Sequence, residues 1–127
     1  MNIQITLSER QAHITAEALE FFMRTLIGQI DMPDAIKWRP ENKDRDYEEL
    51  RRACDHIKQL LFPELMRGAS YGVGWNDKPE QQQAQIAYEI YKAIYYERNQ
   101  REGINNVHSY PALHYSKEPV PTVVAIP

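Results

Sequence analysis

A glycine-rich turn between Gly68 and Trp75 holds the residues of this chain that are best suited to contact a ligand. It reads Gly-Ala-Ser-Tyr-Gly-Val-Gly-Trp, so its glycines let backbone N–H groups approach an anion, and Tyr71 offers a flat face to a nucleobase. Such stacking contributes about 1–3 kcal/mol per base. The same pattern also fits a helix C-cap and a turn in which Tyr71 is packed. It lacks the spacing of the phosphate-binding loops of nucleotide-hydrolysing and dinucleotide-binding enzymes.

Two arginines lie in positions where they either meet an anion or serve a purely structural role. Arg24, next to Thr25, interrupts an apolar part of the first predicted helix, where an arginine faces solvent, pairs with an acid or meets an anion at an interface. Arg98 lies near the end of the last predicted helix, where a cation is favoured by the helix dipole in any case.

Four tyrosines fall within nine residues of the last predicted helix. Tyrosine combines a large apolar area with one polar tip, so such a cluster is typical of a packed face or a subunit contact. We therefore favour an oligomer contact over a ligand pocket for Tyr88, Tyr91, Tyr95 and Tyr96.

Residues suited to catalysis or metal binding do not form a recognisable pattern. Ser70 lacks the Gly-x-Ser-x-Gly setting of a nucleophile, and the four histidines lack the spacing of a zinc site. Cys54 lies in the apolar stripe of a predicted helix, where a buried thiol is the common case. We predict no catalytic residue, no metal site and no cofactor.

The composition predicts one cytoplasmic domain spanning residues 1–127. A net charge of −3 argues against binding to DNA or RNA polymers, which usually requires a strongly basic face. One cysteine excludes a disulfide framework and fits a reducing compartment. The chain shows neither a signal peptide nor an apolar stretch long enough to span a membrane.

Periodicity predicts an α+β fold that is mainly helical. Three helices are expected: a long N-terminal one from the Ser8 capping box to about Asp31, one opening at Asp46, and one opening with a capping Asp77 and fraying from Asn99 to Gly103. Alternating or extended apolar segments predict a small antiparallel sheet from residues 2–7, 107–115 and 122–126.

Several motifs resemble the first family of Thoeris anti-defence proteins, which are phage proteins that act as sponges. The shared motifs are Leu-Ser-Glu-Arg-Gln, Glu-Ala-Leu-Glu-Phe-Phe, Gly-Gln, Ala-Ser-Tyr-Gly and Ala-Tyr-Glu-Ile-Tyr, together with a closing segment rich in proline. In this chain they occupy residues 7–11, 17–22, 28–29, 69–72, 87–91 and 114–121. The resemblance covers most of the chain except the connector 33–46.

The resemblance implies a protein that binds and sequesters, without cleaving, the cyclic ADP-ribose signal made by bacterial TIR proteins, such as glycocyclic ADP-ribose. Members assemble as dimers and hexamers in the infected host cell, with pockets between protomers, and some hold cyclic trinucleotides at separate sites. By motif position, Tyr71 would stack on the base. Ser70, Gly72 and Gly74 would lie near the phosphate or ribose, and Asn76, or Arg98 and Asn99, would complete the pocket. Arg24 and Thr25 would form a second anion site where protomers meet.

Two other functions remain open from the sequence. One is a small phage protein that binds a host protein through its tyrosine-rich helix, and the other is an enzyme that degrades a nucleotide signal. Sequestration requires nanomolar affinity, about −12 kcal/mol, which one exposed loop does not supply, so it requires a closed pocket between subunits.

Overall fold

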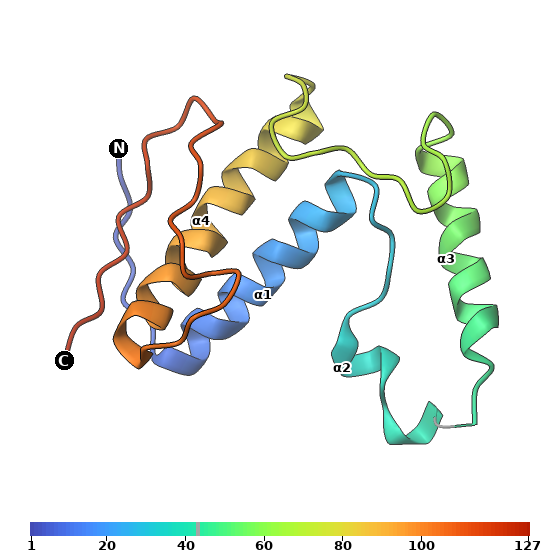
Figure 1. Ribbon diagram of the computed structural model, residues 1–127, viewed down its shortest axis with the longest axis horizontal. Coiled ribbons are helices and arrows are strands. Elements are labelled where there is room, and N and C mark those ends of the chain that lie inside the picture. Colours follow the sequence, from blue (N-terminus) through green and yellow to red (C-terminus); the bar gives the residue numbers. More distant parts are fainter. Residues whose placement is uncertain (43) are drawn as a thin grey trace.

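The computed structural model describes residues 1–42 and 44–127, and its regular elements are all helical (Figure 1). In chain order they are α1 (Glu9–Leu26), α2 (Asp34–Lys37), the 3₁₀ turn η1 (Pro40–Asn42), α3 (Tyr47–Leu61) and α4 (Pro79–Glu102). The described residues contain no β-strand, so the predicted α+β fold with a small antiparallel sheet is wrong. No described helix is long and apolar enough to cross a membrane.

The segments predicted to form the sheet run as irregular extended chain instead. Residues 2–7, 107–115 and 122–126 lie outside every helix, and no strand ladder joins them. An alternating pattern produces a strand only where a neighbour supplies backbone hydrogen bonds, and prolines at 111, 119 and 121 remove donors from the C-terminal segments. The apolar side chains of residues 2–7 consequently remain exposed.

Helix α1 begins as predicted and ends early. Ser8 Oγ accepts from Gln11 N at 3.2 Å, and Gln11 Oε1 accepts from Ser8 N at 2.9 Å, which completes the capping box. The helix ends at Leu26 rather than near Asp31, because Gly28 has a φ of +94°. A Cβ at Gly28 would lie 2.5 Å from Leu65 Cδ1, so this turn is closed tightly against the loop that follows α3.

Helix α3 packs on loops rather than on another long helix. Asp46 caps it as predicted, with Oδ1 accepting from Glu48 N at 3.0 Å. Cys54 is buried on its inner face, and buried Lys58 donates to the carbonyl of Ala69. The one extensive helix–helix contact in the described part of the chain joins α1 and α4, and α3 stands apart from that pair (Figure 1).

Helix α4 is the central element of the fold. Pro79 occupies its first turn and Lys78, not the predicted Asp77, is its N-cap residue. Gly103 ends it in the left-handed conformation, with a φ of +67°. Residues 84–99 are all buried or half-buried, because α1 covers one side and the C-terminal segment runs along another (Figure 1).

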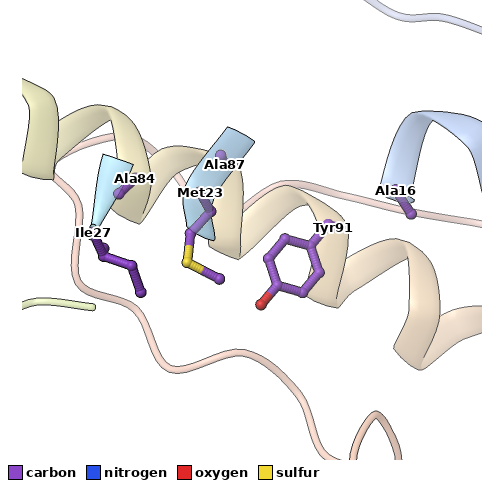
Figure 2. Packing of buried hydrophobic residues seen from close by; sticks show 6 residues of the cluster. All are labelled: Ala16, Met23, Ile27, Ala84, Ala87 and Tyr91. Carbon is purple, nitrogen blue, oxygen red and sulfur yellow. The ribbon is translucent and has the colours of Figure 1, made fainter. Parts of the chain in front are cut away.

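The core forms between α1 and α4, which lie closely side by side (Figure 2). Small side chains permit the approach, and larger ones fill the remaining space. The buried cluster is Ala16, Met23, Ile27, Ala84, Ala87 and Tyr91. Burial of a side chain such as Met23 stabilises the fold by about 1.5–3 kcal/mol.

The tyrosines of α4 pack largely within the chain. Tyr91 is buried, and its ring meets the edges of Tyr88 and Tyr95 at centroid distances of 5.7 and 6.0 Å. Tyr88 also contacts Tyr115 of the C-terminal segment, at 5.9 Å. Within one chain these rings therefore contribute to the core and its cover, and a subunit contact through this helix stays a prediction.

Candidate functional site

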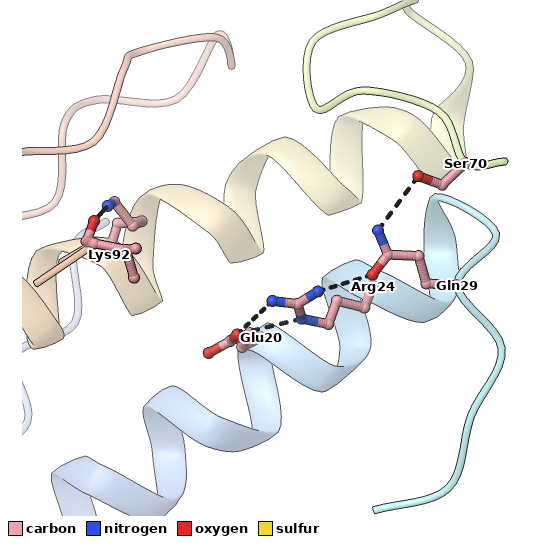
Figure 3. Close-up of polar contacts among 6 residues, drawn as sticks. Glu20, Arg24, Gln29, Ser70 and Lys92 are labelled. Carbon is pink, nitrogen blue, oxygen red and sulfur yellow. Dashed lines mark hydrogen bonds and ion pairs between the residues drawn. The ribbon is translucent and has the colours of Figure 1, made fainter. Parts of the chain in front are cut away.

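A line of polar side chains connects α1 to the glycine-rich turn (Figure 3). Arg24 donates to Glu20 Oε1 at 2.9 and 3.2 Å and to Gln29 Oε1 at 2.8 Å. Gln29 Nε2 then donates to Ser70 Oγ at 3.3 Å. The fold thus brings together Arg24 and Ser70, two predicted site residues that are far apart in sequence. Glu20 already pairs with the guanidinium, so an incoming anion would compete with that carboxylate.

Thr25, the predicted neighbour of Arg24 in a second anion site, is used by its own helix. Its Oγ1 donates to the Phe21 carbonyl at 3.0 Å. That bond is the usual back-bonding of a threonine inside a helix and leaves the hydroxyl with acceptor capacity only.

Tyr71 is half-buried and held at three points. Its backbone N–H donates to the Ile27 carbonyl at 2.8 Å, and its hydroxyl donates to Glu64 Oε1 at 2.7 Å. Its ring lies edge-on to Phe62 at 6.4 Å and packs against the core cluster. The hydrogen bond to Glu64 raises the pKa of the Tyr71 phenol. The ring is therefore fixed in orientation before any ligand arrives.

The two glycines predicted to face a ligand differ in their surroundings. Gly74 has a φ of +85°, and a Cβ there would lie 2.6 Å from the Tyr115 ring. The absence of a side chain at Gly74 is thus needed for packing of the C-terminal segment. Gly72 has nothing within 4 Å of the same position, so its backbone is open to a ligand.

Asn76 organises the entry to α4. Its Oδ1 accepts from Lys78 N at 2.9 Å, and its carbonyl accepts from Gln85 Nε2 at 3.3 Å. Both contacts fix the turn that leads from Gly74 into the helix. Asn76 therefore has a structural role directly after the glycine-rich turn.

Arg98 and Asn99 lie at the opposite end of α4 from the glycine-rich turn. Arg98 contacts His13 Nδ1 at 2.7 Å and Glu9 at 3.7 Å, while buried Asn99 donates to Asn106 Oδ1 at 2.8 Å. A rise of about 1.5 Å per residue puts them about 30 Å from Pro79. A single chain therefore does not gather all the predicted ligand residues into one pocket.

A buried carboxylate that the sequence reading did not single out joins α4 to the C-terminal segment. Glu89 is 3% exposed and accepts from Tyr115 N and Ser116 N, each at 2.7 Å, and from Ser116 Oγ at 2.5 Å. It borders a cavity of about 220 Å³ between α4 and residues 111–123. In the sequence, Glu89 is distinguished only as an acidic residue between two apolar residues, Tyr88 and Ile90, of the last predicted helix.

His108 is a second residue that the sequence reading left unassigned. Its ring stacks on Tyr95 at 4.3 Å, and its Nδ1 is buried without a hydrogen-bond partner. Burial lowers the pKa of His108, and the nearby Lys92 lowers it further. Glu20 and Arg24 of α1 also face this ring, with opposing effects on its pKa.

We expect the stability of the fold to fall with acidity through His108. Its pKa is lower in the folded state, so the unfolded chain binds the proton more readily as pH drops through about 6.5. The loss of stability begins near that pH and levels off below the pKa that His108 has in the folded protein. Urea unfolding of the wild type and of His108→Phe, at about pH 7.5 and 5.5, measures it, because phenylalanine retains a stacked ring without a titrating group. An equal pH dependence in both proteins would show that it does not come from His108.

Comparison with known proteins identifies no relative. No protein-family model, curated protein or solved structure matches this chain. Among the described residues, no three His, Cys, Asp or Glu side chains are grouped so that they could hold a metal ion.

Proposed function

We propose that this protein captures a cyclic ADP-ribose-type signal between copies of itself and sequesters it without cleaving it. The observation that carries the proposal is the separation of the predicted ligand residues into two groups at opposite ends of α4. The first group is Ser70, Tyr71, Gly72 and Asn76, and the second is Arg98 and Asn99. Two copies whose α4 helices run antiparallel would bring the second group of one copy to the first group of the other.

An apolar stripe on α1 supports assembly of copies. Ile14, Phe21 and Phe22 lie at spacings of seven and eight residues and are 55%, 37% and 44% exposed. Ala18 continues the same face. A helix that presents such a stripe away from its own core needs a partner to bury it, and large exposed apolar patches commonly mark interfaces.

The chemistry of the two groups suits an anionic ligand that carries an adenine. Tyr71 supplies a fixed aromatic ring, the exposed backbone at Gly72 supplies one N–H donor, and Arg98 supplies a guanidinium for pyrophosphate. Enclosure between subunits removes the ligand from water and strengthens each of these contacts. Together with the resemblance to the Thoeris anti-defence family, this favours sequestration in the cytoplasm of an infected bacterium. Cyclic trinucleotide binding at a separate site that includes Arg24 is the second part of the proposal.

Titration calorimetry with cyclic ADP-ribose and glycocyclic ADP-ribose tests the proposal directly. We expect dissociation constants at nanomolar level for the preferred ligand, about −12 kcal/mol, and recovery of intact ligand after heat denaturation. Recovery of cleaved products would instead establish a degrading enzyme. A monomer that binds no nucleotide would remove the proposal and leave the host-protein alternative.

Tyr71→Ala should weaken ligand binding at least tenfold, about 1.4 kcal/mol, because it removes the stacking face. Calorimetry gives the affinity, and mass photometry checks that the oligomer survives. Tyr71→Phe is the matched control, since it retains the ring and loses only the bond to Glu64. Unchanged affinity in Tyr71→Ala would remove this residue from the site.

A further inference from the structure

The connector between α1 and α3 contains a cavity of about 260 Å³ that belongs to none of the sites discussed above. Among the described residues that line it are three cationic side chains and two aromatic rings but no carboxylate: Lys37, Trp38, Arg39, Arg45 and Tyr47. The whole chain carries a net charge of −3, so a cavity whose charged lining residues are all cationic differs from the average charge of the protein. Its lining therefore favours an anion.

The aromatic part of this connector cavity is preorganised. Trp38 at the end of α2 stacks on Tyr47 at the start of α3, with ring centroids 5.2 Å apart and planes 12° apart. Lys37 Nζ lies 5.3 Å from the Trp38 ring and 5.6 Å from the Tyr47 ring. Trp38 is nevertheless 62% exposed, so a large part of its ring remains available to another flat group.

The three cations differ in how far their charge is already neutralised. Lys37 Nζ pairs with Asp31 at 2.7 Å, and that hydrogen bond raises the pKa of Lys37 and keeps it charged. Arg39 lies 3.5 Å from Glu41, an exposed pair that contributes little. Arg45 makes no ion pair with any described residue, so its guanidinium retains its donors for a ligand. These donors match the geometry of a phosphate group.

We propose that the connector cavity binds a nucleoside monophosphate, with the base stacked on Trp38 and the phosphate held by Arg45 and Arg39. The aromatic wall accounts for the base and the cations for the phosphate, and a volume of about 260 Å³ suits a small molecule rather than a polymer. The proposal is independent of the signal pocket, because none of its residues belongs to that pocket.

Tryptophan fluorescence tests it, because this chain has only two tryptophans. Trp75→Phe removes the other one, which is 72% exposed in the glycine-rich turn, and leaves Trp38 as the sole reporter. Adenosine 5′-monophosphate should quench Trp38 in a saturable manner below about 10 mM. Adenosine alone should require at least about fivefold more ligand, because it lacks the phosphate contacts, and inorganic phosphate alone, which has no ring to stack on Trp38, should not quench it.

Variants made in the Trp75→Phe background localise the effect. Arg45→Ala should weaken the quenching titration at least about fivefold, and Arg45→Lys by less, since lysine keeps the charge and loses the planar fork. Arg10→Ala, which removes an exposed arginine of α1, is the matched control and should leave the titration unchanged. Quenching that does not saturate, or that weakens equally in Arg10→Ala and Arg45→Ala, would overturn the proposal.

Discussion

Replacing Glu89 by alanine is expected to weaken docking of the C-terminal segment on α4 by about 3–5 kcal/mol. The carboxylate is 3% exposed and accepts three hydrogen bonds, from Tyr115 N, Ser116 N and Ser116 Oγ. Alanine leaves these donors without an acceptor and empties part of the space between helix and segment. Amide hydrogen exchange at Tyr115 and Ser116 should accelerate by about two to four orders of magnitude, which follows from the same free energy.

Glu97→Ala is the matched control for this change. Glu97 lies two turns further along α4 and accepts only one bond, from Ala125 N at 3.2 Å. Its removal should cost about 1 kcal/mol and accelerate exchange at Ala125 alone. Equal and small effects of the two variants would show that the C-terminal segment is held by its apolar contacts rather than by Glu89.

Gly74→Ala is expected to destabilise the fold by about 2–4 kcal/mol. Part of this cost is the left-handed conformation at a φ of +85°, which an L-residue adopts at a cost of about 1–2 kcal/mol. The remainder comes from the Tyr115 ring, which would lie 2.6 Å from the new Cβ and must move. Urea denaturation measures the loss in the free energy of unfolding.

Two neighbouring glycines separate the causes of this loss. Gly68 has a φ of +79° with open space around it, so Gly68→Ala should show the conformational cost alone. Gly72 has neither feature, so Gly72→Ala should stay within about 0.5 kcal/mol of the wild type. If Gly72→Ala nevertheless lowers the affinity for the ligand, the backbone of Gly72 faces the ligand. A loss of stability in Gly74→Ala no larger than in Gly68→Ala would contradict the packing role of Tyr115.

Local rules in the sequence were sufficient for the helices and insufficient for what surrounds them. The capping box at Ser8 and the cap at Asp46 mark helix starts that the structure confirms, whereas α4 stays helical to Glu102 instead of fraying from Asn99. Gly28 was assigned to the helix interior, because nothing local distinguishes a weak helical position from a positive-φ stop. The sheet was wrong for a related reason: alternation at residues 2–7 indicates which side chains share a face, but not whether a partner strand exists.

The candidate site was predictable in its parts and not in its arrangement. The glycine-rich turn drew attention to Tyr71 and Ser70, and the structure adds Gln29 as their link to Arg24. Within one chain the length of α4 separates Arg98 from the glycine-rich turn, so a pocket that contains both requires a second copy. Glu89 and His108 were missed because their roles depend on contacts with a segment more than ten residues away. Such contacts leave no periodic signal in a single sequence.

The isolation of α3 from α1 and α4 implies that this protein will not melt as one cooperative unit. A helix of 15 residues supported mainly by loops has little more than its own propensity and its cap to preserve it, and isolated helices of that length are marginal in water. Circular dichroism on heating should therefore show a shallow early loss of ellipticity from α3, before the steep transition in which α1 and α4 separate. A calorimetric enthalpy larger than the van't Hoff value would be the quantitative sign of this two-stage behaviour.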